Sequence, residues 1–353
     1  MRIKSIEVLG LRNIVSSLLT PGSRGNLISG GNGAGKTSLL EAIYLLGNAK
    51  SFRGTNGQSL VNETTKSLKI SARVVRPDHS NADFQLVKAG SNKRISINNK
   101  PVPNRSTLVR QFPIMFFGHE TVSAQISTPQ ARRVFFDWLL FHVEPDFLAA
   151  YSNYGGLLNH FKAGLRNSHK DSELWNVNLA EAGEELHKIR SSIFEELKII
   201  YQQELSFFCE LPNVDLVYRN GWATEHALAD WLSMRHKDHV RLGYCTVGPH
   251  RADFQLRSRR GEVKTWASRG QLKVYYGLYF LTILKYFLRV SDSRPLVLID
   301  DLWAEMDSVL AGKFLKKIMD SECQVFLTSI EDRKELVNQY DMSRFHVEQG
   351  LVK

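Results

Sequence analysis

The chain has 353 residues, of which 43% are hydrophobic and 23% are charged. This balance excludes an intrinsically disordered chain, and the length is sufficient for two compact lobes. The formal net charge is +10. An excess of lysine and arginine is typical of proteins that contact nucleic-acid phosphates, although many basic proteins bind no nucleic acid.

The same composition indicates where the protein works. The three cysteines, Cys209, Cys245 and Cys323, are far apart and lack the spacing of metal ligands, which indicates free thiols in a reducing compartment. No charged segment with an apolar core opens the chain, so we expect a cytoplasmic protein. The longest apolar stretch, residues 275–288, contains Lys285 and is shorter than the ~20 residues of a membrane span. It predicts a buried helix and no membrane partner.

The first lobe is predicted to be rich in strands. Residues 3–9 alternate between apolar and polar side chains, as the two faces of a half-buried strand require. Further strands are expected at residues 68–75, 83–87 and 94–97, with a turn at Asn98 and Asn99.

A nucleotide-binding loop lies among these strands. Residues 30–37 read GGNGAGKT, a complete G-x-x-x-x-G-K-[ST] motif. The apolar run at residues 25–29 predicts the strand before the loop, and residues 38–46 predict the helix after it. Strand, loop and helix therefore come in the order that such a site requires.

This loop defines the expected cofactor, ATP with Mg²⁺. Glycines adopt the positive φ angles that let backbone N–H groups turn inward around a polyphosphate. Lys36 is expected to neutralise the β- and γ-phosphates and to act in catalysis, and the Thr37 hydroxyl is expected to hold Mg²⁺. The expected nucleotide contacts in this segment are Gly30, Gly31, Asn32, Gly33, Ala34, Gly35, Lys36, Thr37 and Ser38.

The middle of the chain has a different pattern. From residue 122 to about residue 240, apolar residues recur at helical spacing, as at Leu186, Ile189 and Ile193. This pattern predicts a helical arm over residues 122–240, inserted into a head formed by residues 1–121 and 241–353. The sequence contains no long heptad tract, which argues against a long coiled coil.

The segment ASRGQLK, residues 267–273, has two interpretations. Ser268 is a suitable N-cap for the helix predicted to follow. A serine hydroxyl and backbone N–H groups at a helix start also bind anions. In a chain that already has its own nucleotide loop, this second anion site indicates contact with ATP on another subunit, through Ser268, Gly270 and Gln271.

An acidic pair follows the next predicted strand. Residues 295–299 are apolar and lead into Asp300 and Asp301, as expected of a central parallel strand beside a nucleotide. Asp300 is expected to be a Mg²⁺ ligand, and Asp301 is expected to orient or deprotonate the attacking water. A loop with an ordinary helix cap is the alternative for the same pair.

The order of these motifs resembles that of an ABC-type ATPase head, and the chain resembles the bacterial RecF family of recombinational repair ATPases over nearly its whole length. The stretch GPHRAD at residues 248–253 is more specific to this family than the nucleotide loop, which many ATPases share. The resemblance rests on residues 11–13, 33–44, 51–53, 132–138, 248–253, 268–273 and 298–301.

The resemblance implies an α/β fold, an ABC-type ATPase head of mixed sheets and flanking helices with an inserted helical arm. It implies an ATP-dependent homodimer with slow, weakly DNA-stimulated hydrolysis, and a nucleotide contact by Arg12. Thr328 or Ser329 would sense the γ-phosphate in place of the usual histidine. The implied work is DNA repair at single-strand gaps, duplex junctions and stalled forks, with RecO and RecR, to promote RecA loading and the SOS response.

One segment departs from the family pattern. Residues 112–120 read FPIMFFGHE and lack the glutamine that the family usually places near a Pro-Glu or Pro-Asp pair. Gln111 is offset from that position, so no glutamine ligand of Mg²⁺ is assigned. Two other functions remain open on the sequence alone: the ATPase subunit of a transporter, and a P-loop kinase.

Three further charged segments have both a structural and a functional interpretation. Arg133 and Asp137 have the spacing of an i,i+4 ion pair on a helix. His250 is expected to be structural, because no partner for catalysis is evident in the sequence. Contacts to DNA phosphates and a solvated hairpin are both open for Lys93, Arg94 and Lys100.

Overall fold

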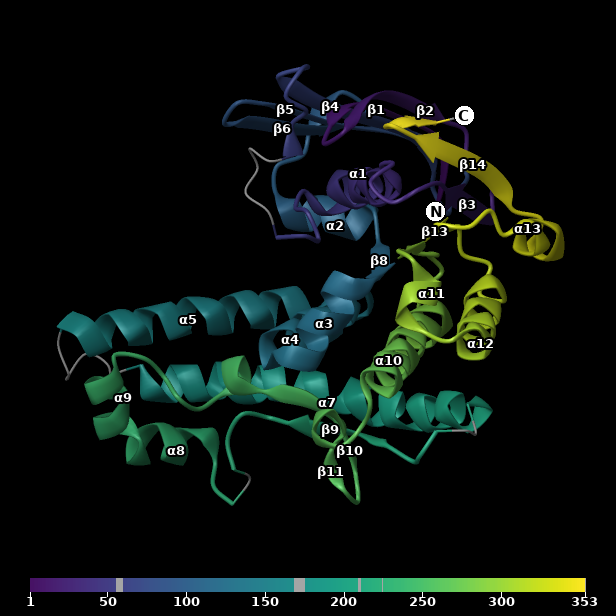
Figure 1. Cartoon of the computed structure of the whole chain (residues 1–353). Helices are drawn as coiled ribbons and strands as arrows, with labels where there is room; N and C mark the ends of the chain where they lie inside the picture. The colour runs from purple at the N-terminus through teal and green to yellow at the C-terminus, as the bar shows by residue number, and fades with distance from the viewer. Residues whose placement is uncertain (55–59, 168–174, 209–210, 224, 353) are drawn as a thin grey trace. The chain divides into compact units, whose positions relative to one another are not determined.

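The computed structural model describes residues 1–54, 60–167, 175–208, 211–223 and 225–352 (Figure 1). These residues form two compact units, one made of residues 1–123 and 288–353 and the other of residues 124–287. The two ends of the chain therefore share the first unit. Cys209 lies outside the described residues, and Cys245 and Cys323 are buried free thiols.

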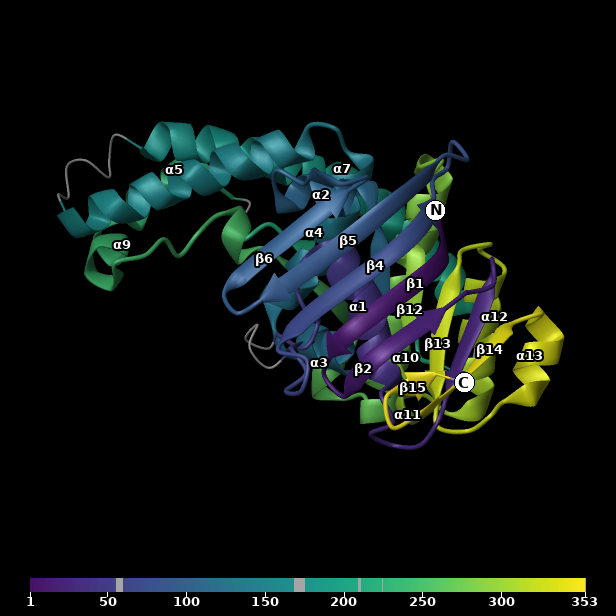
Figure 2. The same cartoon turned by 90° about the horizontal axis from the view of Figure 1, so that it is seen from above.

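The first unit contains an antiparallel sheet, seen face-on in Figure 2. Its strand order is β2-β1-β4-β5-β6-β7. Along β5 the core-facing and solvent-facing positions alternate, because successive side chains of a strand point to opposite faces. Asn98 and Asn99 have positive φ values of 50° and 62° in the expected turn after β6. The strands are β1 (Arg2–Leu11), β2 (Ile14–Leu19), β4 (Ser67–Val75), β5 (Asn81–Ala89), β6 (Asn92–Ile97) and β7 (Lys100–Pro101).

A second, mostly parallel sheet joins segments from both ends of the chain. Its strand order is β15-β14-β3-β13-β12-β8, and only the β14–β15 pair is antiparallel. Every residue of β3, β8, β12 and β13 is buried, which explains their continuous apolar sequences. The strands are β3 (Gly25–Ser29), β8 (Ile114–Phe117), β12 (Leu296–Ile299), β13 (Val325–Ser329), β14 (Ser343–Glu348) and β15 (Leu351–Val352).

Helix α1 (Lys36–Asn48) packs against both sheets of the first unit (Figure 1). It contacts β1, β4 and β5 of the antiparallel sheet and β8 and β13 of the parallel sheet. A helix between two sheets is buried on most of its surface, which fits the mostly apolar residues 39–46 of α1. The other helices of this unit include α2 (Arg105–Gln111), α11 (Leu302–Glu305), α12 (Ser308–Met319) and α13 (Lys334–Tyr340).

The second unit is mainly helical. Its two long helices, α5 and α7, run side by side (Figure 2). The expected apolar face of α7 is observed, with Leu186, Ile193, Leu197 and Ile200 buried and Ile189 half-buried. The helices that lie within the second unit are α4 (Pro129–Val143), α5 (Phe147–Asn167), α7 (Asn176–Phe207), α8 (Leu228–Met234) and α9 (His236–Leu242). Two more helices cross the division between the units, α3 (His119–Ser127) and α10 (Arg269–Val290).

A small sheet explains why the second unit extends beyond residue 240, where the sequence pattern ended the helical arm. Strand β10 (Asp253–Ser258) pairs with β9 (Asp215–Arg219) on one side and β11 (Gly261–Glu262) on the other. The residues after 240 therefore pack with the helices, although their own pattern indicates strands. Two 3₁₀ turns complete this region, η2 (Pro249–Arg251) and η3 (Val263–Thr265).

Two buried ion pairs hold the second unit together. Arg132 donates two hydrogen bonds to the carboxylate of Asp253, at 2.8 and 2.9 Å. Arg190 does the same to Asp137, at 3.0 and 2.8 Å. The predicted Arg133–Asp137 pair was wrong, because Asp137 pairs with Arg190 while Arg133 donates to the carbonyl of Ala252. Asp137 therefore pairs with a residue from another helix and not with a neighbour on its own helix.

His250 has the structural role expected of it. Its Nδ1 lies 2.6 Å from the Tyr154 hydroxyl, and its Nε2 lies 3.0 Å from the carbonyl oxygen of Cys245. Burial lowers the pKa of His250 to about 4, so the ring is neutral near pH 7 and bridges two elements. Among the described residues, no helix is both long enough and apolar enough to cross a membrane.

Candidate nucleotide site

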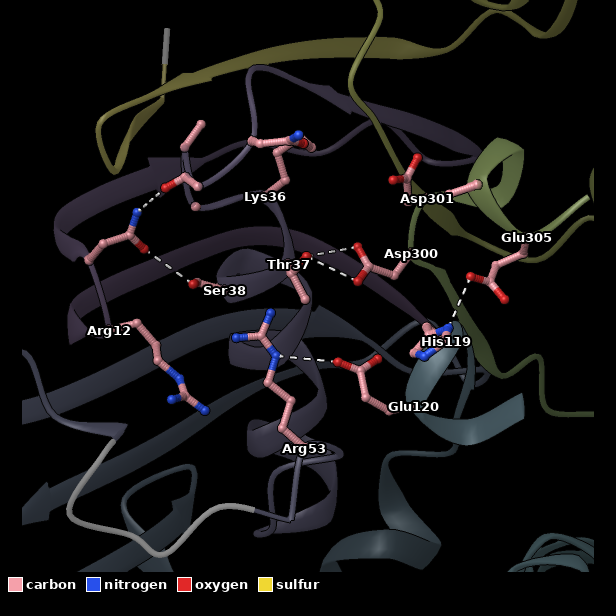
Figure 3. A pocket seen from close by; sticks show the side chains of 16 residues that line it. Arg12, Lys36, Thr37, Ser38, Arg53, His119, Glu120, Asp300, Asp301 and Glu305 are labelled. Carbon is pink, nitrogen blue, oxygen red and sulfur yellow. Dashed lines mark hydrogen bonds and ion pairs between the residues drawn. The ribbon is translucent and has the colours of Figure 1, made fainter. Parts of the chain in front are cut away.

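A cavity of about 550 Å³ lies in the first unit beside the nucleotide loop. The loop follows β3, Asp300 and Asp301 follow β12, and His119 and Glu120 follow β8. These three strands are parallel members of one sheet, so their carboxyl ends meet at the same edge. The topology thereby brings together residues that are more than 260 positions apart (Figure 3).

The nucleotide loop has the backbone geometry that its glycines predict. Gly33 and Gly35 have φ values of 76° and 118°, which side chains with a Cβ rarely adopt. The ammonium group of Lys36 donates hydrogen bonds to the carbonyls of Gly30 and Gly31, at 2.8 and 2.9 Å. Burial lowers the pKa of Lys36, while Asp301 and Asp300 oppose that shift. The positive charge is therefore fixed inside the curve of the loop.

Thr37 and Asp300 meet as the sequence predicts for a Mg²⁺ site. The Thr37 hydroxyl lies 3.0 Å from each carboxylate oxygen of Asp300 (Figure 3). A hydroxyl and a carboxylate are oxygen donors that suit Mg²⁺, which usually takes few protein ligands and completes its shell with phosphate and water. The described residues contain no cluster of three or more His, Cys, Asp or Glu side chains that could hold a metal by themselves. This donor set fits a Mg²⁺ ion that arrives with a nucleotide.

Asp301 has an unusual backbone and a shifted acidity. Its φ is 48°, and its backbone N–H donates to the Thr328 hydroxyl at 2.9 Å. Burial raises the pKa of the Asp301 carboxyl, and the neighbouring charge of Asp300 adds to that shift. A raised pKa increases the basicity of the carboxylate, as suits a group that accepts a proton from water.

Thr328 orients the acidic pair. Its hydroxyl donates to Asp300 at 2.6 Å and accepts the backbone N–H of Asp301. Thr328 and Ser329 are both buried, and neither is among the described residues that line the cavity. The structure therefore gives Thr328 a position behind the carboxylates, and a contact of Thr328 or Ser329 with the γ-phosphate stays a prediction.

Arg12 lies at the cavity and is held by a buried carboxylate. It donates two hydrogen bonds of 2.9 Å to Glu41, whose side chain on α1 has 0% exposure. Ser51 also donates to Glu41, and Arg53 lies 3.9 Å from it. Glu41 is a site residue that the motifs did not identify, and its signal in the sequence is a charge inside the apolar run of residues 39–46.

The edge of the cavity below Thr37 contains further residues that the motifs did not identify. Arg53 lies 3.7 Å from Glu120, and His119 lies 3.3 Å from Glu305 (Figure 3). His119 and Glu120 occupy the segment after β8, where the family's glutamine was absent from the sequence. Gln111 lies elsewhere, because its side chain accepts a hydrogen bond from Arg76.

Asn13 supports the loop from the opposite side. Its side-chain amide donates to the carbonyl of Gly33 at 3.0 Å and accepts from the Ser38 hydroxyl at 3.2 Å. Of the expected nucleotide contacts, Arg12 and residues 32–38 line the cavity. The carbonyls of Gly30 and Gly31 instead bind Lys36.

Ser268, Gly270 and Gln271 belong to the second unit, whereas the cavity is lined by residues of the first. Ser268 accepts from the Gln271 backbone at 3.2 Å, and the Gln271 side chain accepts from the Ser268 backbone at 3.0 Å. This reciprocal capping box satisfies two N–H groups at the start of α10. Ser268 and Gly270 remain exposed to solvent, where a second molecule can reach them.

The known proteins that are similar to this chain agree on one family. The model of the RecF/RecN/SMC N-terminal domain family matches residues 2–351. The DNA replication and repair protein RecF of Shewanella sp. strain MR-7 is 31% identical over 357 residues, covering 100% of this chain and 99% of that protein. RecF of Shewanella baltica strain OS223 is 30% identical over 358 residues, with the same coverage.

Solved structures agree on the fold. The recombination mediator protein RecF with ATP superposes with a TM-score of 0.84 at 24% identity, covering 100% of this chain and 97% of that one. The Smc head domain of Pyrococcus furiosus has a TM-score of 0.60 at 13% identity, covering 100% and 95%. The expected α/β ATPase-head fold, with its mixed sheets and flanking helices, is therefore confirmed.

Proposed function

Because the chain belongs to the RecF/RecN/SMC family and is similar to RecF over its full length, we propose that it is an ATP-dependent DNA-binding repair protein of the cytoplasm. It acts at single-strand gaps, duplex junctions and stalled forks, with RecO and RecR, to promote RecA loading and SOS induction. The full-length similarity favours this function over a transporter subunit or a P-loop kinase. The net charge of +10 supports a nucleic-acid partner.

The observation that carries the proposal is the convergence of Lys36, Thr37 and Asp300 at one cavity. ATP binds with its β- and γ-phosphates against Lys36 and the backbone N–H groups of the loop. Arg12 adds a guanidinium that Glu41 holds in a fixed orientation. Thr37 and Asp300 would hold Mg²⁺, which would supply positive charge that neutralises the phosphates.

Hydrolysis requires a base near the attacking water. Asp301 lines the same cavity, and its raised pKa suits it to orient that water and accept its proton. Thr328 holds both the Asp300 carboxylate and the backbone of Asp301. Asp300 is therefore placed to bind Mg²⁺, and Asp301 is placed to act on the water. Slow hydrolysis would then reset an ATP-bound state rather than drive continuous turnover.

ATP also joins two copies of the chain in this proposal. The exposed capping box at Ser268 presents a hydroxyl and the N-terminal turn of the 22-residue helix α10. These groups would contact the γ-phosphate of ATP held by the Lys36 loop of a second copy. DNA would then bind to the ATP-closed homodimer.

Mixed subunits test the shared site. Lys36→Ala removes the charge that neutralises the phosphates, and Ser268→Arg adds bulk and charge at the contact with the second copy. Neither variant alone should dimerise with ATP in analytical ultracentrifugation. A mixture of the two retains one complete site, so it should form ATP-dependent heterodimers. Normal dimerisation of Ser268→Arg alone would contradict a shared site.

DNA binding has its own test. The logarithm of the affinity should fall linearly with the logarithm of the salt concentration, because each phosphate contact releases condensed counterions. We expect this dependence for gapped DNA in the presence of ATP, measured by fluorescence anisotropy. A flat salt response, or no binding with ATP present, would contradict a nucleic-acid partner.

A further inference from the structure

Strand β5 carries a charge where its pattern calls for an apolar residue. Ala82, Phe84 and Leu86 are buried on the core-facing side of this strand. Lys88 takes the next position on the same face and is only 8% exposed. A lysine at a core-facing position of a strand is uncommon, because removing its charge from water is unfavourable.

A second lysine lies directly opposite the first. Lys93 of β6 is the cross-strand partner of Lys88, so both side chains are on the same face of the sheet. Like charges in directly opposite positions destabilise a sheet. Unlike Lys88, Lys93 is exposed to solvent, yet its pKa is lowered, first by partial desolvation and then by the positive charges of Lys88, Arg105 and Lys50.

The charges of this cluster have no acidic partners among the residues that the structure describes. Lys88 donates to the carbonyl of Gly90 at 2.6 Å, and Lys93 donates to the carbonyl of Ala49. Arg105 donates to the carbonyl of Asn48 at 2.7 Å. Backbone carbonyls at the end of α1 therefore receive hydrogen bonds, but no described carboxylate neutralises the cluster.

These lysines line a cavity that is separate from the nucleotide site. It has a volume of about 460 Å³, which is within the range of small-molecule sites. Leu45, Leu68 and Leu86 form part of its wall, and Lys50, Lys88 and Lys93 supply its charge. No described lining residue is acidic, and no described residue is shared with the nucleotide cavity.

We propose that this cavity binds a phosphate group, carried by a free nucleotide or by a nucleic-acid strand, between Lys88 and Lys93. An anion there would satisfy the opposed ammonium groups, and the leucine wall would accept the apolar part of the ligand. The site goes beyond the proposed ATPase, because none of its described lining residues lines the nucleotide cavity. It also accounts for the charge of Lys88 at a core-facing position of β5.

Chemical labelling tests the site on the full-length protein. Acetic anhydride acylates neutral amines, and mass spectrometry reports the reaction of each lysine separately. Pyrophosphate at ten times its dissociation constant should slow the labelling of Lys93 about tenfold, because only about one site in eleven then remains free. A short single-stranded oligonucleotide forms the second arm. Protection by either ligand supports the site and identifies the source of the phosphate, whereas protection by neither overturns the proposal.

Lys88→Leu separates binding from a purely structural role. If the lysine serves a ligand, leucine should raise the melting temperature of the ligand-free protein, because it removes an uncompensated charge from the core face. The same variant should lose the protection of Lys93 by pyrophosphate. A lower melting temperature with protection unchanged would instead show that Lys88 only supports the turn at Gly90 and would overturn its role in the site.

Lys69→Leu is the matched control. Lys69 lies on the neighbouring strand β4, next to the core-facing Leu68, and forms an ion pair with Glu7 at 3.8 Å. Its replacement removes the same charge from the other face of the same sheet. The protection of Lys93 should therefore persist, and its loss in this control would overturn a site specific to Lys88. If Lys88→Leu fails to fold, the labelling of the unmodified protein still decides the proposal.

Discussion

The two units use charged motifs in opposite ways. In the second unit, Arg132 and Asp253 form a buried ion pair, and Arg132 is only 1% exposed. In the first unit, Lys36 and Asp301 face a cavity and are held apart by backbone contacts. In sequence the two kinds of motif look alike, because both are short stretches that contain charged residues. The difference teaches that a charged motif identifies a family, while only its partners decide whether it is structural or catalytic.

The largest effect is expected from Asp301→Asn. The amide keeps the shape of the side chain but cannot accept a proton, so hydrolysis should fall roughly 10²–10⁴-fold, the usual contribution of a general base. ATP-bound dimers should persist, because Thr37 and Asp300 are unchanged. Single-turnover hydrolysis and sedimentation measure the two properties separately. Undiminished hydrolysis would assign the base to another residue.

Arg132→Ala should act on stability instead. It leaves the carboxylate of Asp253 buried without its partner, which costs about 3–5 kcal/mol of unfolding free energy. Urea unfolding followed by intrinsic fluorescence measures the loss. The double variant Arg132→Met with Asp253→Leu removes both charges and should recover most of it. If Arg132→Ala were as stable as the native chain, the Arg132–Asp253 pair would not be structural. The contrast with the cavity residues Lys36 and Asp301 would then fail.

The two units should also respond differently to acid. Burial lowers the pKa values of His239 and His250 to about 4, from an ordinary value of 6.5. The unfolded chain binds these protons first, so the stabilising effect of both groups is complete above pH 6.5 and is lost as the pH falls towards 4. The raised pKa of Asp301 acts in the opposite direction, since protonation of that carboxyl favours the folded state.

Unfolding midpoints measured from pH 7 to pH 4 check the histidine effect. His250→Gln keeps a donor and an acceptor near Tyr154 but does not titrate in this range. The variant should therefore lose less stability between pH 7 and pH 4 than the native chain. The loss that remains should come from His239. An equally steep loss of stability in this variant would show that other groups control the acid response.

The smallest effect is expected from Ser268→Ala. It removes the hydroxyl that caps the backbone N–H of Gln271, which costs about 0.5–2 kcal/mol. Thermal unfolding measures this loss. Ser268→Thr retains the hydroxyl and is the matched control for stability. If Ser268→Ala also lowers ATP-dependent dimerisation more than its stability loss explains, the residue serves both the helix and the second copy.

Several features followed from the sequence because their causes are local. Positive φ angles at Gly33 and Gly35, the buried strands before Lys36 and Asp300, and the alternation of β5 depend on neighbouring residues alone. The family resemblance added the fold class, which the comparisons confirmed. The roles assigned to individual site residues remain predictions for the experiments above.

Tertiary structure decided which of these charged residues meet. Glu41 binds Arg12, which is 29 positions away in the sequence. Asp137 pairs with Arg190, which is 53 positions away, and not with the nearby Arg133. The boundary of the second unit also depended on a long-range event, the pairing of β10 with β9. Local patterns record the conformation and burial of each segment, because those follow from backbone preferences and hydrophobicity. The partner of a buried charge is set by packing between distant segments, which the local pattern does not encode.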